Sequence, residues 1–433
     1  MHDETAVLHF GFPSGQESTR ATSVPIYQTV AHDFESAAHA GAIFDMEIPG
    51  FHYNRLNNPT NSVLEDRMAE LERGTSALTV ASGTAAMSYA VLNVASAGCN
   101  IVSTPHLYGG TYTYFAHVLP TFGVDVRLGE NASPEAIAKH VDANTRAIFC
   151  ESIGNPAGDV TDLDGLAQVA REHGVPLIVD NTVPTPFMLK PILHGADVVI
   201  HSLTKFIGGH GTTLGGCIID GGSFDWMAHG GRFPMFSEPD DAFHGVTFGE
   251  AYPRDAFVVR ARSVCLRNTG ATLAPFNAFL ILQGLETLPV RLERHEKNAR
   301  RLAEYLAQDD RVEWVSFAGL PDDLNRPMAR RYLGDHVPSI ITFGPRGGYD
   351  AAIAFHDSVQ LFKRLVNLGD ARSLVSHSAS TTHRQLSPSE LRDVGIRPET
   401  IRLSVGLEHI EDLLEDVDQA LTLSQAVVSV AGQ

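Results

Sequence analysis

Two segments of the chain place reactive side chains directly after apolar runs. Asp180 follows the apolar run Pro176–Val179, and Lys205 follows a second apolar run, with Ser202 and Thr204 beside it. At the carboxyl ends of strands in an α/β sheet, such side chains face the crevice that binds ligands. A pyridoxal phosphate site needs these groups: the amine forms a Schiff base, the carboxylate pairs with the pyridinium nitrogen, and the hydroxyls bind phosphate.

Lys205 differs from the other lysines, which lie in polar helices or beside proline. It stands among small hydroxyl residues and before the glycine-rich stretch 208–211. Desolvation there would lower the pKa of the amine and favour the neutral form that imine exchange requires. A lone lysine at a strand end is more often solvated or paired with an acid. Asp180, at the end of another strand, favours the ligand site instead.

Three further positions are candidates for the same site. The turn Ser82-Gly83-Thr84 follows a short strand and begins a helix, so its backbone N–H groups could hold a phosphate. It is neither a Walker loop nor a dinucleotide fingerprint, and many such turns carry Ser and Gly. Tyr108 could stack on a flat cofactor or be an ordinary buried aromatic residue. Arg402 could bind a substrate carboxylate or form a surface ion pair.

The elements that must position these residues alternate between strand and helix. The predicted strands are 77–81, 100–104, 147–150, 177–179, 196–200 and 216–219, and the predicted helices are 62–74, 84–94, one beginning at Ser133-Pro134, and 163–172. This rhythm predicts an α/β fold with a mostly parallel, doubly wound sheet. From about residue 291 a long helix and short strands indicate a smaller α+β domain. We therefore expect an extended arm at 1–58, a large domain at 59–292 and a C-terminal domain at 293–433.

Composition excludes several classes of function. The formal net charge of −19 argues against a nucleic-acid partner, because phosphate binding needs a basic surface. No apolar run of about 18 residues or signal region appears, so neither a membrane span nor secretion is expected. The spacing of Cys99, Cys150, Cys217 and Cys265 fits neither a zinc site nor a disulfide framework, which favours the cytoplasm. The 20 histidines are scattered without metal-ligand spacing, so no metal is expected.

Taken together, these residues resemble the Cys/Met-metabolism family of pyridoxal-phosphate enzymes, which has the transferase fold of type I. The resemblance extends over nearly the whole chain. It is carried by the motifs Tyr53-Asn-Arg55-Leu-Asn-Asn-Pro59-Thr60, Ala81-Ser-Gly83, Leu107-Tyr-Gly-Gly-Thr111, Glu151-Ser-Ile-Gly-Asn155-Pro156, Val179-Asp-Asn-Thr182, Ser202-Leu-Thr-Lys205 and Arg402-Leu-Ser-Val-Gly406.

The resemblance implies a role for each matching residue. Lys205 would be the Schiff-base lysine, Tyr108 would stack on the ring and take part in catalysis, and Asp180 would pair with the pyridine nitrogen. The other cofactor contacts would be Ser82, Gly83, Thr84, Thr182, Ser202 and Thr204, and the substrate contacts would be Asn155, Ser373 and Arg402. Tyr53 and Arg55 would reach the cofactor phosphate of a neighbouring subunit. The resemblance thus implies dimers with shared active sites, assembled into a homotetramer.

Within the family, three features are similar to the O-acetylhomoserine sulfhydrylases: Gly110, where methionine γ-lyases carry cysteine; the segment 230–253, which resembles a longer insertion; and the stretch 275–288. They imply γ-replacement on O-acetylhomoserine with sulfide or a thiol, giving homocysteine or methionine and acetate, as in methionine biosynthesis. The inserted segment could cover the site and limit water. Two departures, Ser378 in place of proline and Thr84 in place of methionine or glutamine, affect positions near the expected contacts.

Other functions remain open at this point. The nearest are the γ-elimination of methionine γ-lyase and the γ-replacement of cystathionine γ-synthase, which use the same residues. A catalytically silent protein that keeps the fold as a binding module is a different class, and the presence of Lys205, Asp180 and Tyr108 argues against it. A nicotinamide dehydrogenase would need a G-x-G-x-x-G turn after its first strand, which this sequence lacks.

Overall fold

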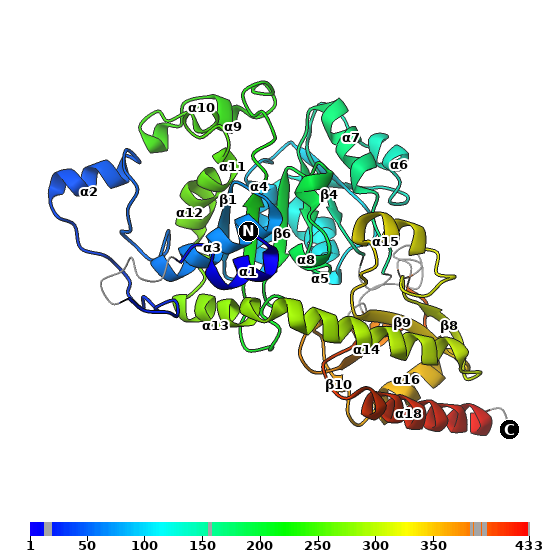
Figure 1. The fold of residues 1–433 in the computed structure, drawn as a ribbon. Helices are drawn as coiled ribbons and strands as arrows, with labels where there is room; N and C mark the ends of the chain where they lie inside the picture. Colours follow the sequence, from blue (N-terminus) through cyan, green and yellow to red (C-terminus); the bar gives the residue numbers. More distant parts are fainter. Residues whose placement is uncertain (13–19, 155–157, 382–383, 385–390, 392–395, 432–433) are drawn as a thin grey trace.

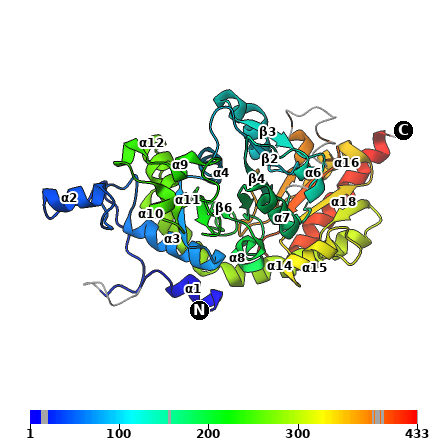
Figure 2. The ribbon, with the colours of Figure 1, turned by 90° about the horizontal axis from the view of Figure 1, so that it is seen from above.

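The computed structural model describes residues 1–12, 20–154, 158–381, 384, 391 and 396–431, and it contains two β-sheets (Figures 1 and 2). The larger sheet has seven strands in the order β1-β7-β6-β5-β4-β2-β3. Their bounds are β1 Ser76–Val80, β2 Asn100–Ser103, β3 Asp125–Leu128, β4 Thr145–Glu151, β5 Leu177–Asp180, β6 Val198–Ser202 and β7 Gly216–Asp220.

The prediction of a mostly parallel sheet is confirmed, with two differences. β7 pairs antiparallel with both β1 and β6, whereas the pairs from β6 to β3 are parallel. β3, which was not predicted, is an edge strand whose sequence Asp125-Val-Arg-Leu128 lacks a continuous apolar run. The predicted strands were found because both faces of the central strands are buried, so each reads as an apolar run.

Helices cover both faces of the large sheet. α4 (Gly83–Leu92) begins at Ser82, whose side chain accepts a hydrogen bond from Ala85 N, and α6 (Pro134–Ala138) begins at Ser133 in the same way. These are ordinary N-caps, and Pro134 occupies the first helical position, where no backbone donor is needed. α7 (Leu163–His173) turns its apolar stripe to the core. The other helices around this sheet are α3 (Pro59–Glu72), α5 (Gly109–Thr113), α8 (Thr185–Met188) and α13 (Pro275–Glu286).

The smaller sheet lies in the C-terminal part of the chain. Its order is β10-β11-β12-β9-β8, with bounds β8 Val312–Ser316, β9 Ile340–Pro345, β10 Lys363–Arg364, β11 Leu374–His377 and β12 Ile401–Ser404. α14 (Leu288–Gln308), α16 (Gly348–Ser358) and α18 (Ile410–Ala431) enclose its apolar core, and α15 (Arg326–Leu333) lies nearby. The proposed domain boundary at 292/293 falls inside α14, so one continuous helix belongs to both parts.

The N-terminal segment differs from the extended arm that we expected. It contains two short helices, α1 (Asp3–His9) and α2 (Ala37–Phe44). α1 is held by the buried Arg67 of α3, whose guanidinium donates to the carbonyl oxygens of Val7, Leu8 and Phe10. α2 projects away from the body of the chain in both views (Figures 1 and 2).

The inserted segment 230–253 belongs to a compact subdomain beside the large sheet. Trp226 stacks on Phe236 and packs edge-on against Phe233, and Phe257 lies against the same cluster. Phe236 lies in α9 (Pro234–Ser237) and Phe257 in α11 (Ala256–Arg260), and α10 (Phe248–Ala251) comes between these helices in the sequence. The four cysteines are free thiols. In the described part of the chain, no helix is long and apolar enough to cross a membrane.

Candidate active site

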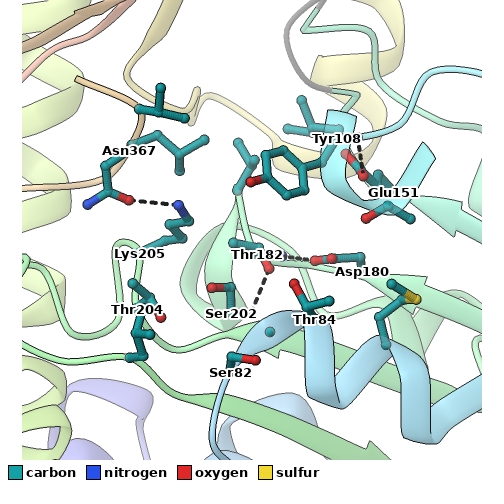
Figure 3. A pocket seen from close by; sticks show the side chains of 18 of the residues that line it. Ser82, Thr84, Tyr108, Glu151, Asp180, Thr182, Ser202, Thr204, Lys205 and Asn367 are labelled. Atoms are coloured by element: carbon teal, nitrogen blue, oxygen red, sulfur yellow. Dashed lines mark hydrogen bonds between the residues drawn. The ribbon is translucent and has the colours of Figure 1, made fainter. Parts of the chain in front are cut away.

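The carboxyl ends of β4, β5 and β6 lie at one edge of the large sheet, together with the segments that follow β1 and β2. A cavity of about 190 Å³ lies at this edge (Figure 3). Ten of the residues expected from the sequence line it: Ser82, Gly83, Thr84, Tyr108, Asp180, Thr182, Ser202, Thr204, Lys205 and Arg402. The cavity therefore lies where ligands bind in α/β sheets.

Lys205 lies in the turn after β6, with its amine directed to the C-terminal domain. Its Nζ donates a 2.7 Å hydrogen bond to Asn367 Oδ1 (Figure 3). Burial, followed by the positive charge of Arg402, lowers the pKa of Lys205 to about 8, while Asp180 acts in the opposite direction. A substantial fraction of this amine is thus neutral near pH 8, which a lysine nucleophile requires.

Arg402 brings a second cation to the cavity from β12 of the smaller sheet. Its side chain is buried, and Nη2 donates to the backbone carbonyl of Asn367 at 2.9 Å. Burial lowers its pKa to about 10, so it stays charged at neutral pH. Lys205 and Arg402 give this part of the cavity a place for an anionic group, although the carboxyl groups of Asp180 and Glu151 also line the cavity.

Asp180 ends β5 and faces the same cavity. Its Oδ1 accepts a 2.9 Å hydrogen bond from Thr182 N, and Thr182 Oγ1 in turn accepts one from Ser202 N at 2.8 Å. Burial raises the pKa of Asp180, although its contacts with Thr182 and the charge of His201 oppose the rise. A desolvated carboxyl group of this kind gains stability from a positively charged group placed beside it.

The N-terminus of α4 closes one end of the cavity and can hold a phosphate. Its free backbone N–H groups are a natural anion site, and hydroxyls from Thr84 and Ser202 lie around it. Gly83 is required by the close approach of β6, because a Cβ at residue 83 would lie 2.6 Å from Ser202 Cβ. The turn thus brings helix and strand backbone together around one small space.

Tyr108 stands at the start of α5 with its ring over the cavity (Figure 3), and 40% of the residue is exposed. Its backbone N–H donates a 2.6 Å hydrogen bond to Glu151 Oε1. Gly110 leaves room for the ring, since a Cβ at residue 110 would lie 2.6 Å from Tyr108 Cε1. The ring position therefore depends on having glycine two residues later.

Four expected site residues are not among those that line the cavity. Tyr53 and Arg55 are exposed, with the Arg55 guanidinium 5.2 Å from the centre of the Tyr53 ring. The Ser373 hydroxyl is buried elsewhere, donating to Glu408 Oε2 and accepting from Gly406 N, each at 2.8 Å. That placement does not support a substrate contact by Ser373. Asn155 lies outside the described residues.

Glu151 and Asn367 are among the cavity residues that the sequence did not single out. Glu151 ends β4 as Asp180 ends β5, and the two residues pair across the neighbouring strands. The rule that identified Asp180 applies equally to it. Asn367 lies in an irregular segment before β11, where no periodicity or motif signals a functional residue. The inserted segment 230–253, which we expected to cover the site, contributes no residue to the cavity lining of its own chain.

These residues fit pyridoxal phosphate. A lysine of lowered pKa would hold the aldehyde carbon, a carboxyl group of raised pKa the pyridine nitrogen, and a helix N-terminus with hydroxyls around it the phosphate. Tyr108 presents a ring over the space between them. No group of three or more His, Cys, Asp or Glu residues suited to a metal ion occurs among the described residues.

Comparisons with known proteins agree with this geometry. The sequence profile of the family described as Cys/Met metabolism PLP-dependent enzyme matches residues 4–422. An O-acetyl-L-homoserine sulfhydrylase of Leptospira meyeri is 45% identical, with 96% of each chain covered. A homocysteine synthase of Schizosaccharomyces pombe is 44% identical, covering 98% of this chain and 99% of the relative.

A solved structure from Campylobacter jejuni, named as an O-acetylhomoserine (thiol)-lyase, superposes with a TM-score of 0.94 at 40% identity. The match covers 98% of this chain and 100% of that one, which contains N'-pyridoxyl-lysine-5'-monophosphate at position 205. With the family profile spanning nearly the whole sequence, the chain belongs to the Cys/Met-metabolism family of pyridoxal-phosphate-dependent enzymes.

Proposed function

We propose that this enzyme replaces the γ-acetoxy group of O-acetylhomoserine with sulfide, giving homocysteine and acetate. A thiol acceptor in place of sulfide would give methionine or a related thioether. The observation that carries the proposal is the joint placement of Lys205, Asp180 and Arg402 in one cavity. The relatives named above supply the substrate class.

Arg402 is the group that binds the substrate carboxylate in this proposal. A guanidinium can hold a carboxylate through two parallel hydrogen bonds, which fixes orientation as well as position. Its Nη2 contact with the Asn367 carbonyl sets the plane of the guanidinium before substrate arrives. The α carbon of the substrate is thereby directed to the side of the cavity where Lys205 lies.

Bound pyridoxal phosphate would supply the electron sink that stabilises negative charge at the substrate carbon atoms. Lys205 would then serve as the proton carrier: in its neutral form it would accept a proton from the α carbon, and it must give that proton up before it can accept one from the β carbon. Its pKa of about 8 suits both acceptance and return of the proton near neutral pH. Asp180 would keep a proton at the pyridine nitrogen, and Tyr108 would hold the ring plane.

The nearest alternative is elimination, in which no external nucleophile is captured and a keto acid is released. Gly110 favours replacement over elimination in this proposal, because the Tyr108 ring occupies the space that a side chain at residue 110 would need, so no cysteine thiol can stand there with the ring in this position. The cavity lining of this chain does not support the expectation that the segment 230–253 excludes water. The preference thus depends on the surroundings of Tyr108 and on the relatives.

The N-terminal arm supports a shared active site between two subunits. Tyr53 and Arg55 lie on a segment with exposed apolar side chains, among them Val30 (64% exposed) and Phe44 (53% exposed). Such a surface on a projecting segment is typical of a contact with another chain. In our proposal Tyr53 and Arg55 reach the phosphate of the neighbouring subunit's cofactor, two such dimers form a tetramer, and the enzyme acts in the cytoplasm.

The proposed reaction is tested by measuring products from wild-type enzyme. O-acetylhomoserine or O-succinylhomoserine is supplied with sulfide, cysteine or methanethiol, and homocysteine, α-ketobutyrate and ammonia are quantified. We expect homocysteine from O-acetylhomoserine and sulfide to form fastest. Faster release of α-ketobutyrate and ammonia under the same conditions would identify the enzyme as a γ-lyase instead.

The surroundings of Lys205 predict a pH dependence of cofactor uptake. Only the neutral amine attacks the aldehyde, and its pKa is lowered from 10.5 to about 8. The rate at which cofactor-stripped enzyme develops its visible absorption band should therefore rise through pH 8 and level off above it. Lys205→Ala should show no such band. Arg402→Ala should move the midpoint upward, because one nearby positive charge is lost; an unchanged midpoint would contradict the assigned electrostatics.

Gly110→Ala should displace the ring of Tyr108, since the new Cβ would lie within 2.6 Å of it. We expect turnover with sulfide to fall roughly tenfold or more, as small misplacements of catalytic groups do, with a larger share of α-ketobutyrate. Gly231→Ala is the matched control, because its Cβ would meet nothing within 4 Å. Equal effects of the two substitutions on turnover would show that the Tyr108 contact is unimportant.

A shared active site predicts complementation between two inactive variants. Arg55→Ala lacks the arm contact and Lys205→Ala lacks the nucleophile, but a mixed dimer would contain one site with both residues. After subunit exchange at equal amounts we expect about a quarter of wild-type activity, because half of the dimers are mixed and each has one intact site. No recovery, despite exchange verified by mass, would contradict the shared site.

A further inference from the structure

Helix α14 connects the two parts of the chain that supply the catalytic cations. It begins beside the end of α13, under the large sheet, and continues along the smaller sheet (Figure 1). Three buried polar residues, Arg291, His295 and Asn298, occur at spacings of four and three residues and so share one face. We refer to these three residues as the polar face of α14.

Arg291 holds the turn that carries Lys205. Its guanidinium donates to the carbonyl oxygens of Phe206 at 2.8 Å, Ile207 at 3.1 Å and Gly284 at 2.7 Å. Burial lowers its pKa to about 10, so it remains a cation at neutral pH. Gly209 makes room for it, because a Cβ at residue 209 would collide with the guanidinium. A buried cation held by carbonyl oxygens fixes the turn directly after Lys205.

His295 contacts both catalytic segments. Its ring packs edge-on against Phe206, with centroids 5.5 Å apart, and its Nδ1 lies 2.6 Å from the carbonyl oxygen of Val405. Because a carbonyl oxygen only accepts, Nδ1 carries the proton. Burial lowers the pKa of His295 to about 4, which leaves the ring neutral. One side chain thus joins the residue after Lys205 to the segment that follows Arg402.

Asn298 completes the contact with the Arg402 segment. Its Nδ2 donates to the carbonyl oxygens of Gly406 at 2.9 Å and Glu408 at 3.0 Å. These carbonyls lie just beyond the end of β12, the strand that carries Arg402. The polar face of α14 therefore contacts the Lys205 turn at one end and the Arg402 segment at the other.

We propose that Arg291, His295 and Asn298 are positioning residues that fix Lys205 relative to Arg402 across the two sheets. A helix rises 1.5 Å per residue, so about 10 Å of rigid backbone separates residues 291 and 298. Side chains that bind main-chain carbonyls at both ends transmit that fixed spacing to the two segments. For the roles of Lys205 and Arg402 the inference rests on the proposed function.

The two ends of the polar face should affect different kinetic constants. Loosening the Lys205 turn should slow proton transfer and weaken the hold on the cofactor, so Arg291→Lys should lower kcat about tenfold. It should also speed loss of cofactor from holoenzyme during dialysis. Loosening the Arg402 segment should weaken carboxylate binding, so Asn298→Ala should raise KM for the amino-acid substrate about tenfold and change kcat little.

The matched control is Arg67→Lys. Arg67 is also buried and also donates to three main-chain carbonyls, and it pairs with Glu286 of α13, but none of these partners lines the cavity. It should lower thermal stability without changing kcat, KM or cofactor retention of the folded enzyme. A general loss of packing would affect all three variants alike, whereas positioning separates kcat from KM.

Two outcomes would overturn the inference. One is that Arg291→Lys and Asn298→Ala, corrected for folded fraction, match wild type in kcat, KM and cofactor retention. The other is that Arg67→Lys reproduces their changes. Cofactor retention is read from the visible absorption of holoenzyme and requires no substrate. If the wild-type enzyme does not use O-acetylhomoserine, the proposed reaction is wrong. The loss of cofactor during dialysis still tests whether Arg291 holds the Lys205 turn.

Discussion

The hydrogen bond between Lys205 Nζ and Asn367 Oδ1 joins the two sheets at the point where chemistry would occur. Lys205 comes from the large sheet, and Asn367 from the C-terminal part, where its carbonyl also accepts from Arg402. One residue thus contacts both cations of the cavity. This hydrogen bond can form only if the two sheets keep a fixed position relative to each other. It therefore depends on the packing of the whole chain.

Burial of the guanidinium groups of Arg402 and Arg291 has a cost in free energy that other contacts must offset. Arg402 and Arg291 are each about 6% exposed, and burial lowers the pKa of both to about 10. Taking a charge out of water costs several kcal/mol unless polar groups replace the solvent. Arg291 obtains carbonyl oxygens from three residues, whereas Arg402 faces a cavity that an anion can enter. The same residue type holds a turn in one place and lines a cavity in the other.

The sequence predicted the part of the site that depends on strand ends. Asp180, Ser202 and Lys205 follow apolar runs, and the position of such residues in a parallel sheet is set by topology alone. Asn367 escaped prediction because its segment has no regular structure and is placed by tertiary contacts. Arg291 escaped because a charged residue in a polar-looking helix reads as solvated. Its burial depends on the Phe206–Ile207 carbonyls, which lie about 85 residues away in the sequence.

The fold, like the site, could be predicted only where the sequence itself carries a regular pattern. Buried parallel strands produce apolar runs, whereas the direction of β7 leaves no trace in its own residues, and the edge strand β3 is too polar to stand out. The helix α1 was missed for a related reason. A seven-residue helix has little stability by itself, and here it is held by Arg67, a residue more than fifty positions away.

Arg67 and Arg291 make similar contacts but hold different parts of the chain. Both arginines are buried, and both donate to three main-chain carbonyls. The carbonyls that Arg67 binds belong to a terminal helix remote from the cavity, and those of Arg291 include the two residues directly after Lys205. Disturbing the contact between Arg67 and α1 would lower the stability of the folded chain. In our proposal, disturbing the contacts of Arg291 changes where Lys205 stands in the folded chain, and a displacement of about 1 Å at a catalytic group is enough to alter turnover.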